Sequence, residues 1–179
     1  MPFVSPTITV RRVSDELWEV VEPLAYHGRS DTFVVPAGFR TDFATVPRPV
    51  VWLIPRFGRY TLAAVLHDWL ITEGLAAGVV SARDADGLFR RVLRELDVPP
   101  VRRWLMWTGV RWGSAATGHW AGWWRDAPLV LVISVLAAPV VVPPAVLITL
   151  ALAVYAVVET LVTAALPGDH RRTDGGIRL

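Results

Sequence analysis

The sequence contains no cysteine and no lysine, and one long stretch near its C-terminus carries almost no charge. The missing cysteine excludes disulfide bonds, thiolate catalysis and cysteine-ligated zinc. Because lysine is absent, the 18 residues with a basic Lys or Arg side chain are all arginines, and the formal net charge is only +2. Bulk electrostatics thus give no reason to expect nucleic acid as a partner.

Several common catalytic signatures are also missing. The chain has no G-x-S-x-G turn, no P-loop and no G-x-G-x-x-G segment, which argues against an α/β-hydrolase, a P-loop NTPase and a dinucleotide-binding enzyme. The first twelve residues contain no apolar core of signal-peptide length, so we expect no cleaved export signal.

The stretch of low charge is strongly apolar. Between Asp126 and Asp169 the only charged residue is Glu159. A continuous helix of about 40 residues would be about 60 Å long, twice the thickness of a bilayer core. Because Pro143-Pro144 lies near the middle, we expect a break there and a transmembrane helical hairpin over residues 126–168. A polar disordered tail would follow over residues 169–179.

Arginines flank both ends of this segment, with Arg125 before it and Arg171 and Arg172 after it. By the positive-inside rule, a hairpin would place the soluble domain and both termini in the cytoplasm, at a bacterial inner membrane. The expected partners are therefore the lipid bilayer and, through the hairpin, a second copy of the chain. A buried core hairpin in a soluble protein is the alternative, but such a hairpin should show polar alternation that this stretch lacks.

Residues 1–125 have the pattern of one α+β domain. Segments rich in β-forming residues at 8–13, 17–27 and 31–38 are separated by turn residues and predict a small antiparallel meander. The region after Gly38 is interrupted by three prolines, which disfavour continuous helix up to about residue 58.

Three helical patterns follow. The first begins at Tyr60 and should end at Gly74 or Gly78. Ser81 is a good N-cap for the second helix, and Pro99-Pro100 should begin a third, tryptophan-rich helix. The sequence therefore predicts a small antiparallel sheet followed by two or three packed helices, plus the C-terminal hairpin. The tryptophans of the third helix could pack in the core, lie at a membrane interface or stack on a nucleic acid or sugar.

Two short motifs contain the residues best suited to chemistry. TDFATVPR spans Thr41 to Arg48, and HDWL begins at His67. A carboxylate beside a histidine can act in general acid–base catalysis, so Asp42, His67 and Asp68 are the candidate catalytic residues. Thr41 and Arg48 are candidate binding residues, with Arg48 as an anion contact or a clamp on its loop.

The same side chains also suit a metal ion. Asp42, His67 and Asp86 have the ligand types of zinc or another divalent metal, which is the only cofactor that the sequence suggests. A buried polar network, in which His67 bridges Asp42 and Asp86, would use the same groups. His67 and Asp68 are adjacent on a helix, so their side chains diverge by about 100°. The sequence alone leaves both interpretations open.

Three longer segments resemble, in order, the landmarks of a family of tailed-phage and prophage proteins, domain of unknown function 1353. These segments are VPAGFRTDFATVPR, GRYTLAAVLHDWL and SARDADGLFRRVLRELDV, and the later WTGVRWG fits the family's last helix. The resemblance covers about Trp18 to Trp124. Asp86 matches the aspartate of the family's A-D-x-x-F motif, whereas Thr45 replaces the usual serine. The resemblance implies a phage or prophage origin and no established activity.

Two functions are compatible with these features. The first is a membrane-anchored, phage-derived module without enzymatic activity, which binds phage structural or lysis proteins. The alternative is a metal-dependent, hydrolase-like enzyme acting at the cell envelope. An enzyme should expose Asp42 and His67 in a cleft, whereas a structural network should bury them.

Overall fold

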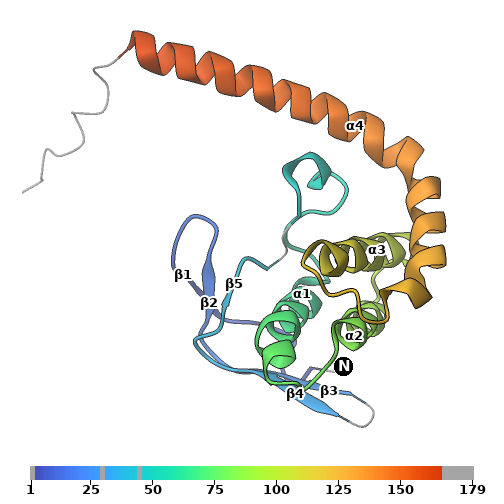
Figure 1. Ribbon diagram of the computed structural model, residues 1–179. Coiled ribbons are helices and arrows are strands. Elements are labelled where there is room, and N and C mark those ends of the chain that lie inside the picture. Colours follow the sequence, from blue (N-terminus) through green and yellow to red (C-terminus); the bar gives the residue numbers. More distant parts are fainter. Residues whose placement is uncertain (1–2, 29–30, 44–45, 167–179) are drawn as a thin grey trace, which may run out of the picture.

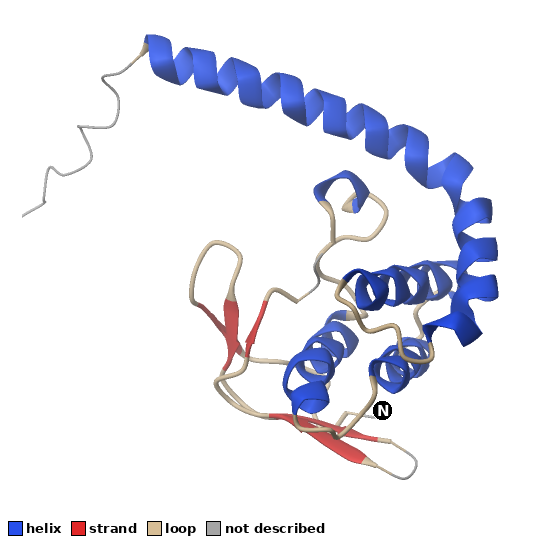
Figure 2. Ribbon diagram, viewed as in Figure 1, coloured by secondary structure: helices blue, strands red, loops and turns tan. Residues whose placement is uncertain are grey.

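The computed structural model describes residues 3–28, 31–43 and 46–166. Small antiparallel sheets pack beside a group of helices, and one long helix extends from this body (Figure 2). The predicted α+β class is confirmed. The tail predicted for residues 169–179 lies outside the described residues, and so does Thr45, which replaces the usual serine.

The strands form two sheets instead of one meander. Strands β1 (Val10–Arg12), β2 (Trp18–Val20) and β5 (Arg40–Thr41) pair in that order, and β3 (Leu24–His27) pairs with β4 (Thr32–Val35). All neighbours are antiparallel. The single strand expected over 17–27 is divided at Pro23, because a proline cannot donate a ladder hydrogen bond.

The three predicted helices are confirmed as α1 (Thr61–Trp69), α2 (Ala82–Glu95) and α3 (Pro100–Ala116). Helix α1 continues into a π-helical turn, η2 (Leu70–Gly74). Ser81 caps α2 as expected: its side chain accepts a hydrogen bond from the backbone N–H of Asp84 at 3.2 Å. In the described part of the proline-rich loop before α1, residues Arg48–Val50 form a short 3-10 helix, η1.

One core lies between the sheets and the helices. Its fully buried side chains come from both kinds of element: Val20, Tyr26 and Val35 from strands, and Val65, Leu66, Val92 and Leu93 from α1 and α2. A second, smaller cluster joins α3 to the start of the long helix α4.

The expected hairpin is wrong, because α4 is one helix from Trp123 to Ala165. Pro128, Pro139, Pro143 and Pro144 all lie inside it. A proline removes one hydrogen bond and bends a helix, but its own φ is helical. Reversing the chain needs residues in non-helical conformations, and α4 contains no glycine that could supply one. Figure 1 accordingly shows a bent helix that continues as a long arm.

The first turns of α4 pack against α3. Trp123, Ala127 and Val130 are buried there, and the Trp123 indole donates a hydrogen bond to the backbone carbonyl of Arg111 at 3.0 Å. Further along, Trp112 Nε1 donates to Ser134 Oγ at 3.1 Å. Residues 126–134, the first part of the expected membrane segment, therefore contact the α+β domain.

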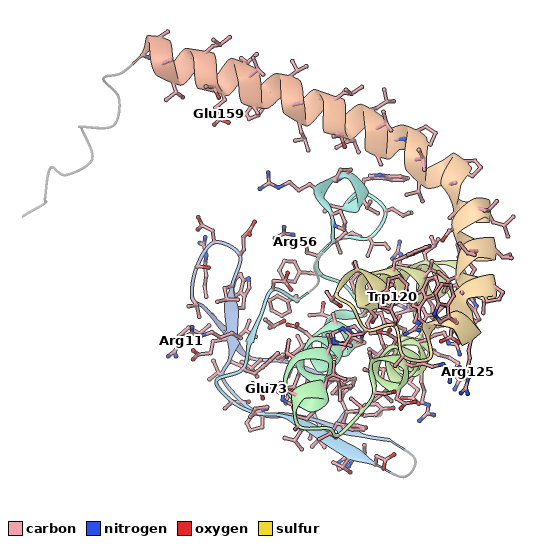
Figure 3. All side chains as sticks on the ribbon, viewed as in Figure 1. Arg11, Arg56, Glu73, Trp120, Arg125 and Glu159 are labelled. Carbon is pink, nitrogen blue, oxygen red and sulfur yellow. The ribbon has the colours of Figure 1, made fainter. Side chains whose placement is uncertain are left out.

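No residue of α4 after Val130 is buried: some as far as residue 148 are half-buried, η1 contacts the helix, and residues 151–165 are all exposed. The most apolar 18-residue window of α4 has a mean hydropathy of 2.5, and none of that window is buried. By length and composition, this helix could cross a membrane. Figure 3 places Glu159 on this arm, far along the helix from Arg125 and Trp120 at its base. Both termini were expected in the cytoplasm because of the hairpin, and one continuous helix removes that reason.

We predict that Trp123→Ala lowers the free energy of unfolding by about 3–5 kcal/mol, because it empties the α3–α4 cluster and removes a buried hydrogen bond. Trp124→Ala is the matched control: Trp124 is 72% exposed whereas Trp123 is 4% exposed. Chemical denaturation of the full chain in a neutral detergent measures both. Equal losses for the two variants would mean that α4 is not docked on α3.

Candidate functional site

Asp86 lies at the meeting point of three helices. It is fully buried on the core face of α2. One carboxylate oxygen, Oδ1, is 2.7 Å from Nε2 of His67 on α1. The other, Oδ2, accepts hydrogen bonds from Arg111 Nη1 at 2.8 Å and from Ser114 Oγ at 2.7 Å, both on α3. A single carboxylate therefore holds α1, α2 and α3 together.

His67 lies at the edge of this network. Its side chain is 15% exposed, and its ring packs on Phe89 with the centroids 4.8 Å apart. The hydrogen bond between Nε2 and Asp86 Oδ1 turns the imidazole ring toward the buried carboxyl group. Of the network in which His67 was expected to bridge Asp42 and Asp86, the structure contains the hydrogen bond between His67 and Asp86.

A second acid extends the network to α4. Arg111 Nε is 3.5 Å from Asp126 Oδ2, and Asp126 also accepts two hydrogen bonds from Arg83 on α2, at 3.0 and 3.1 Å. Arg111 is fully buried, yet its Nε and Nη2 make no hydrogen bond within the part of the chain that the structure describes. Hydrogen bonds and ion pairs thus connect His67 on α1 to the first turn of α4.

The backbone conformation of Gly122 allows Arg83 to reach Asp126. Gly122 has a φ of 71° and precedes α4 directly. A Cβ atom at this position would lie 2.8 Å from Cδ of Arg83. Glycine therefore both permits the left-handed turn and leaves room for the arginine that binds Asp126.

The predicted metal set is not assembled. Across residues 3–28, 31–43 and 46–166, no group of three His, Asp or Glu side chains could hold a metal ion. Both oxygens of Asp86 are already engaged, and one contacts the permanent charge of Arg111. A guanidinium at that distance repels a divalent cation. Asp42, His67 and Asp86 therefore do not form a common site in this structure.

Asp68 belongs to a separate polar cluster beside β5. Burial raises its pKa, a hydrogen bond from Thr41 lowers it, the charge of Asp42 raises it and His67 lowers it, and the net shift is upward. Thr41 is buried, and its Oγ1 also accepts a hydrogen bond from the backbone N–H of Phe43 at 2.9 Å. Thr41, Asp42 and Asp68 therefore lie together, and His67 and Asp68 point into different clusters, as adjacent helical residues should.

Arg48 does not join either cluster. It lies in η1, is exposed, and makes no ion pair with any residue that the structure describes. Instead, η1 contacts the long helix α4. The role of Arg48 as an anion contact stays a prediction.

Sequence reasoning missed Arg111, Ser114 and Asp126. A signal was present for two of them: Trp107, Arg111, Ser114 and Ala115 are spaced by three or four residues and form the buried face of α3. An arginine at a buried position of a helix needs a carboxylate partner inside the protein. Asp126 had no such signal, because it looked like the polar end of a membrane segment.

A match to a family model agrees with the motifs of the chain. The model of the family described as "Protein of unknown function (DUF1353)" matches residues 18–110, just over half of the chain, and the chain belongs to this family. The match includes Thr41, Asp42, His67, Asp68 and Asp86 but ends before Arg111. No curated protein and no solved structure matches the chain.

We predict that Asp86→Leu and Arg111→Met each lower the free energy of unfolding by about 3–5 kcal/mol, because each leaves a buried charge without its partner. The double variant should lose less than the sum of the two, since neither charge is then stranded. A double-mutant cycle of denaturation curves measures the coupling. Strict additivity would contradict the view that the two side chains act as a pair.

Asp68→Asn should raise the melting temperature at pH 7. The native state holds the Asp68 proton more tightly than the unfolded chain, so this residue makes stability fall as the pH rises from 3.8 through its raised native pKa. Below about pH 3 the carboxyl is protonated in both states, and the two proteins should melt together.

The control for this variant is Asp15→Asn, at a side chain that is 95% exposed. It should leave the melting curve nearly unchanged at both pH values. Melting curves recorded across the pH range test the claim, and a lower melting temperature of Asp68→Asn at pH 7 would show that the ionised carboxylate stabilises the fold.

Proposed function

We propose that the protein is a membrane-anchored binding module without enzymatic activity. The observation that carries the proposal is the exposed apolar arm of α4, which is joined to the domain through buried contacts of Trp123 and through Asp126. A soluble protein would leave this large apolar surface in water at a high cost. A bilayer removes that cost.

The dimensions of the arm support one crossing. From Pro144, the second proline of the last pair, to Ala165 the helix contains no further proline. This stretch makes up about 22 residues, or about 33 Å of helix, which matches the apolar thickness of a bilayer. The first turns of α4 are occupied by α3, so the domain would lie close to the membrane surface.

The burial and the hydrogen bonds of the network around Asp86 support a non-enzymatic role. His67 and Asp86 are hydrogen-bonded to each other, and the side chains are 15% and 0% exposed. Their donors and acceptors serve the packing of three helices, which is what a structural network requires. The motif resemblance supports a phage or prophage derivation, a place in the bacterial inner membrane, and phage structural or lysis proteins as partners.

One observation favours a second function. Asp68 is a half-buried carboxyl with a raised pKa beside a second carboxylate, Asp42, and such pairs often serve as acid and base in hydrolysis. In this alternative, Thr41, Asp42 and Asp68 form the site of a hydrolase at the cell envelope. Asp68→Asn should then abolish hydrolysis of an envelope substrate while it stabilises the fold.

Membrane insertion can be tested with the full chain. We expect the wild type to stay in the membrane pellet after alkaline carbonate extraction. Leu150→Arg/Val154→Arg should move a large part of it to the supernatant, because each central arginine costs about 2.5–3.5 kcal/mol of insertion. Leu150→Phe is the control and should stay in the pellet. Release of the wild type by carbonate would contradict the anchor.

Reporter fusions test the topology separately. A single span should place reporters at the N-terminus and after Leu179 on opposite sides of the membrane. A reporter that is active only in the periplasm and one that is active only in the cytoplasm should therefore give opposite results at the two ends. The same result at both ends would restore a hairpin in the bilayer.

A further inference from the structure

A groove of about 1230 Å³ runs between α2, α3 and the start of α4. Five arginines line it: Arg83, Arg90, Arg91 and Arg94 from α2, and Arg103 from α3. We call this surface the arginine groove. The rest of its lining includes three aspartates, two tryptophans, Leu129 of α4, residues of β4, and the apolar side chains of Val79, Val80 and Leu88.

The guanidinium of Arg90 is held in place by two indoles. Its Cζ lies 4.5 Å from the ring centroid of Trp104 and 4.9 Å from that of Trp107. Arg90 is partly buried and makes no hydrogen bond or ion pair with the residues that the structure describes. Cation–π contact therefore fixes its position and leaves its N–H donors for another partner.

The neighbouring arginines also lack carboxylate partners. Within the described part of the chain, Arg91, Arg94 and Arg103 form no ion pair. The pKa of Arg90 is lowered, mainly by burial; the charge of Asp126 acts in the opposite direction, and Arg103 and then Arg94 lower the pKa further. The positive charges thus lie close enough to repel one another.

Two of the three aspartates of the groove also bind other side chains. Asp126 is shared by Arg83 and the buried Arg111. Asp84 accepts a hydrogen bond from the Ser81 hydroxyl at the start of α2. Arginines that repel one another across two helices, with one of them preoriented by aromatic rings, are typical of a surface that binds an anion with several acceptor oxygens.

We propose that the arginine groove binds the phosphate group of a small anionic ligand. Guanidinium groups from two helices can reach different oxygens of one phosphate, and Arg90 is already oriented for it. Two sources share this chemistry, an anionic phospholipid headgroup and a soluble phosphate ester. Leu129 places the groove next to the apolar side of α4, where the acyl chains of a lipid could continue.

A long nucleic acid fits these observations less well. The formal net charge of the chain is only +2, and the arginine groove is bounded by α4 at one end. Polyanion binding draws on basic residues spread along a continuous track. Nucleic acid is therefore the competing hypothesis, and the affinity of the full chain for single-stranded oligonucleotides of different lengths is measured as well.

The test uses the full chain in a neutral detergent and does not depend on membrane spanning. Native mass spectrometry measures the binding of phosphatidylglycerol and, as a neutral comparison, phosphatidylcholine. Calorimetry measures glycerol 3-phosphate and inorganic phosphate. Arg94→Gln/Arg103→Gln should weaken phosphate binding by about tenfold or more, because it removes two charge-assisted contacts.

Arg59→Gln/Arg102→Gln is the matched control. It removes the same net charge, both side chains are exposed, and neither lines the arginine groove, although Arg102 is the neighbour of Arg103 on α3. Its affinities should stay within about twofold of the wild type. Circular dichroism checks that both variants are folded.

The outcomes separate the sources and can overturn the proposal. If Arg94→Gln/Arg103→Gln loses binding of phosphatidylglycerol but not of glycerol 3-phosphate, the result supports a lipid headgroup. If it loses binding of glycerol 3-phosphate but not of phosphatidylglycerol, the result supports a soluble ester. Equal losses in both double variants, or no binding of any phosphate compound to the wild type, would overturn it. Affinity that appears only for oligonucleotides and grows with their length would replace it with a polyanion surface. Phosphate binding without carbonate-resistant membrane association would contradict the anchor alone.

Discussion

A carboxylate without solvent must be surrounded by hydrogen-bond donors, and Asp86 meets this requirement with side chains from two other helices. The positions of α1 and α3 relative to α2 are consequently fixed by polar geometry as well as by apolar packing. Arg111 carries the constraint further, because it also faces Asp126 in the first turn of α4. The direction in which the long helix leaves the domain therefore depends on a buried charge network that begins at His67.

Elements with strong local signals could be predicted from the sequence. Ser81 and Pro99-Pro100 mark helix starts directly, and both signals are confirmed. Strand β5 could not be predicted, because it has only two residues and exists through its pairing with β2. The hairpin expectation failed for a related reason: Pro143-Pro144 marks a bend, but whether a chain bends or reverses depends on residues that permit a turn, and α4 has no glycine to provide one.

The candidate site was predicted in part. The link between His67 and Asp86 follows from residue type and helical position, and the divergence of His67 from Asp68 follows from the helix geometry. Arg111 was not recognised, because an arginine among tryptophans also suits a membrane interface. Burial distinguishes core packing from a membrane interface: Trp107 and Trp123 are core residues, whereas Trp124 is 72% exposed. Long-range contacts between α1, α2 and α3 set this burial, and a local pattern does not contain them.

Asp126 links the two charged regions of the molecule. It accepts two hydrogen bonds from Arg83, at the edge of the arginine groove, and it faces Arg111 inside the buried network. By neutralising Arg83, it leaves the groove's uncompensated charge on the arginines farther along α2 and on Arg103. By pairing with Arg111, it also holds the base of the apolar arm. A buried ion pair is weak evidence for stability, because removing two charges from water costs about as much as their attraction returns. The contacts of Arg111 with Asp86 and Asp126 instead fix the base of α4, and with it one wall of the arginine groove, relative to α2 and α3.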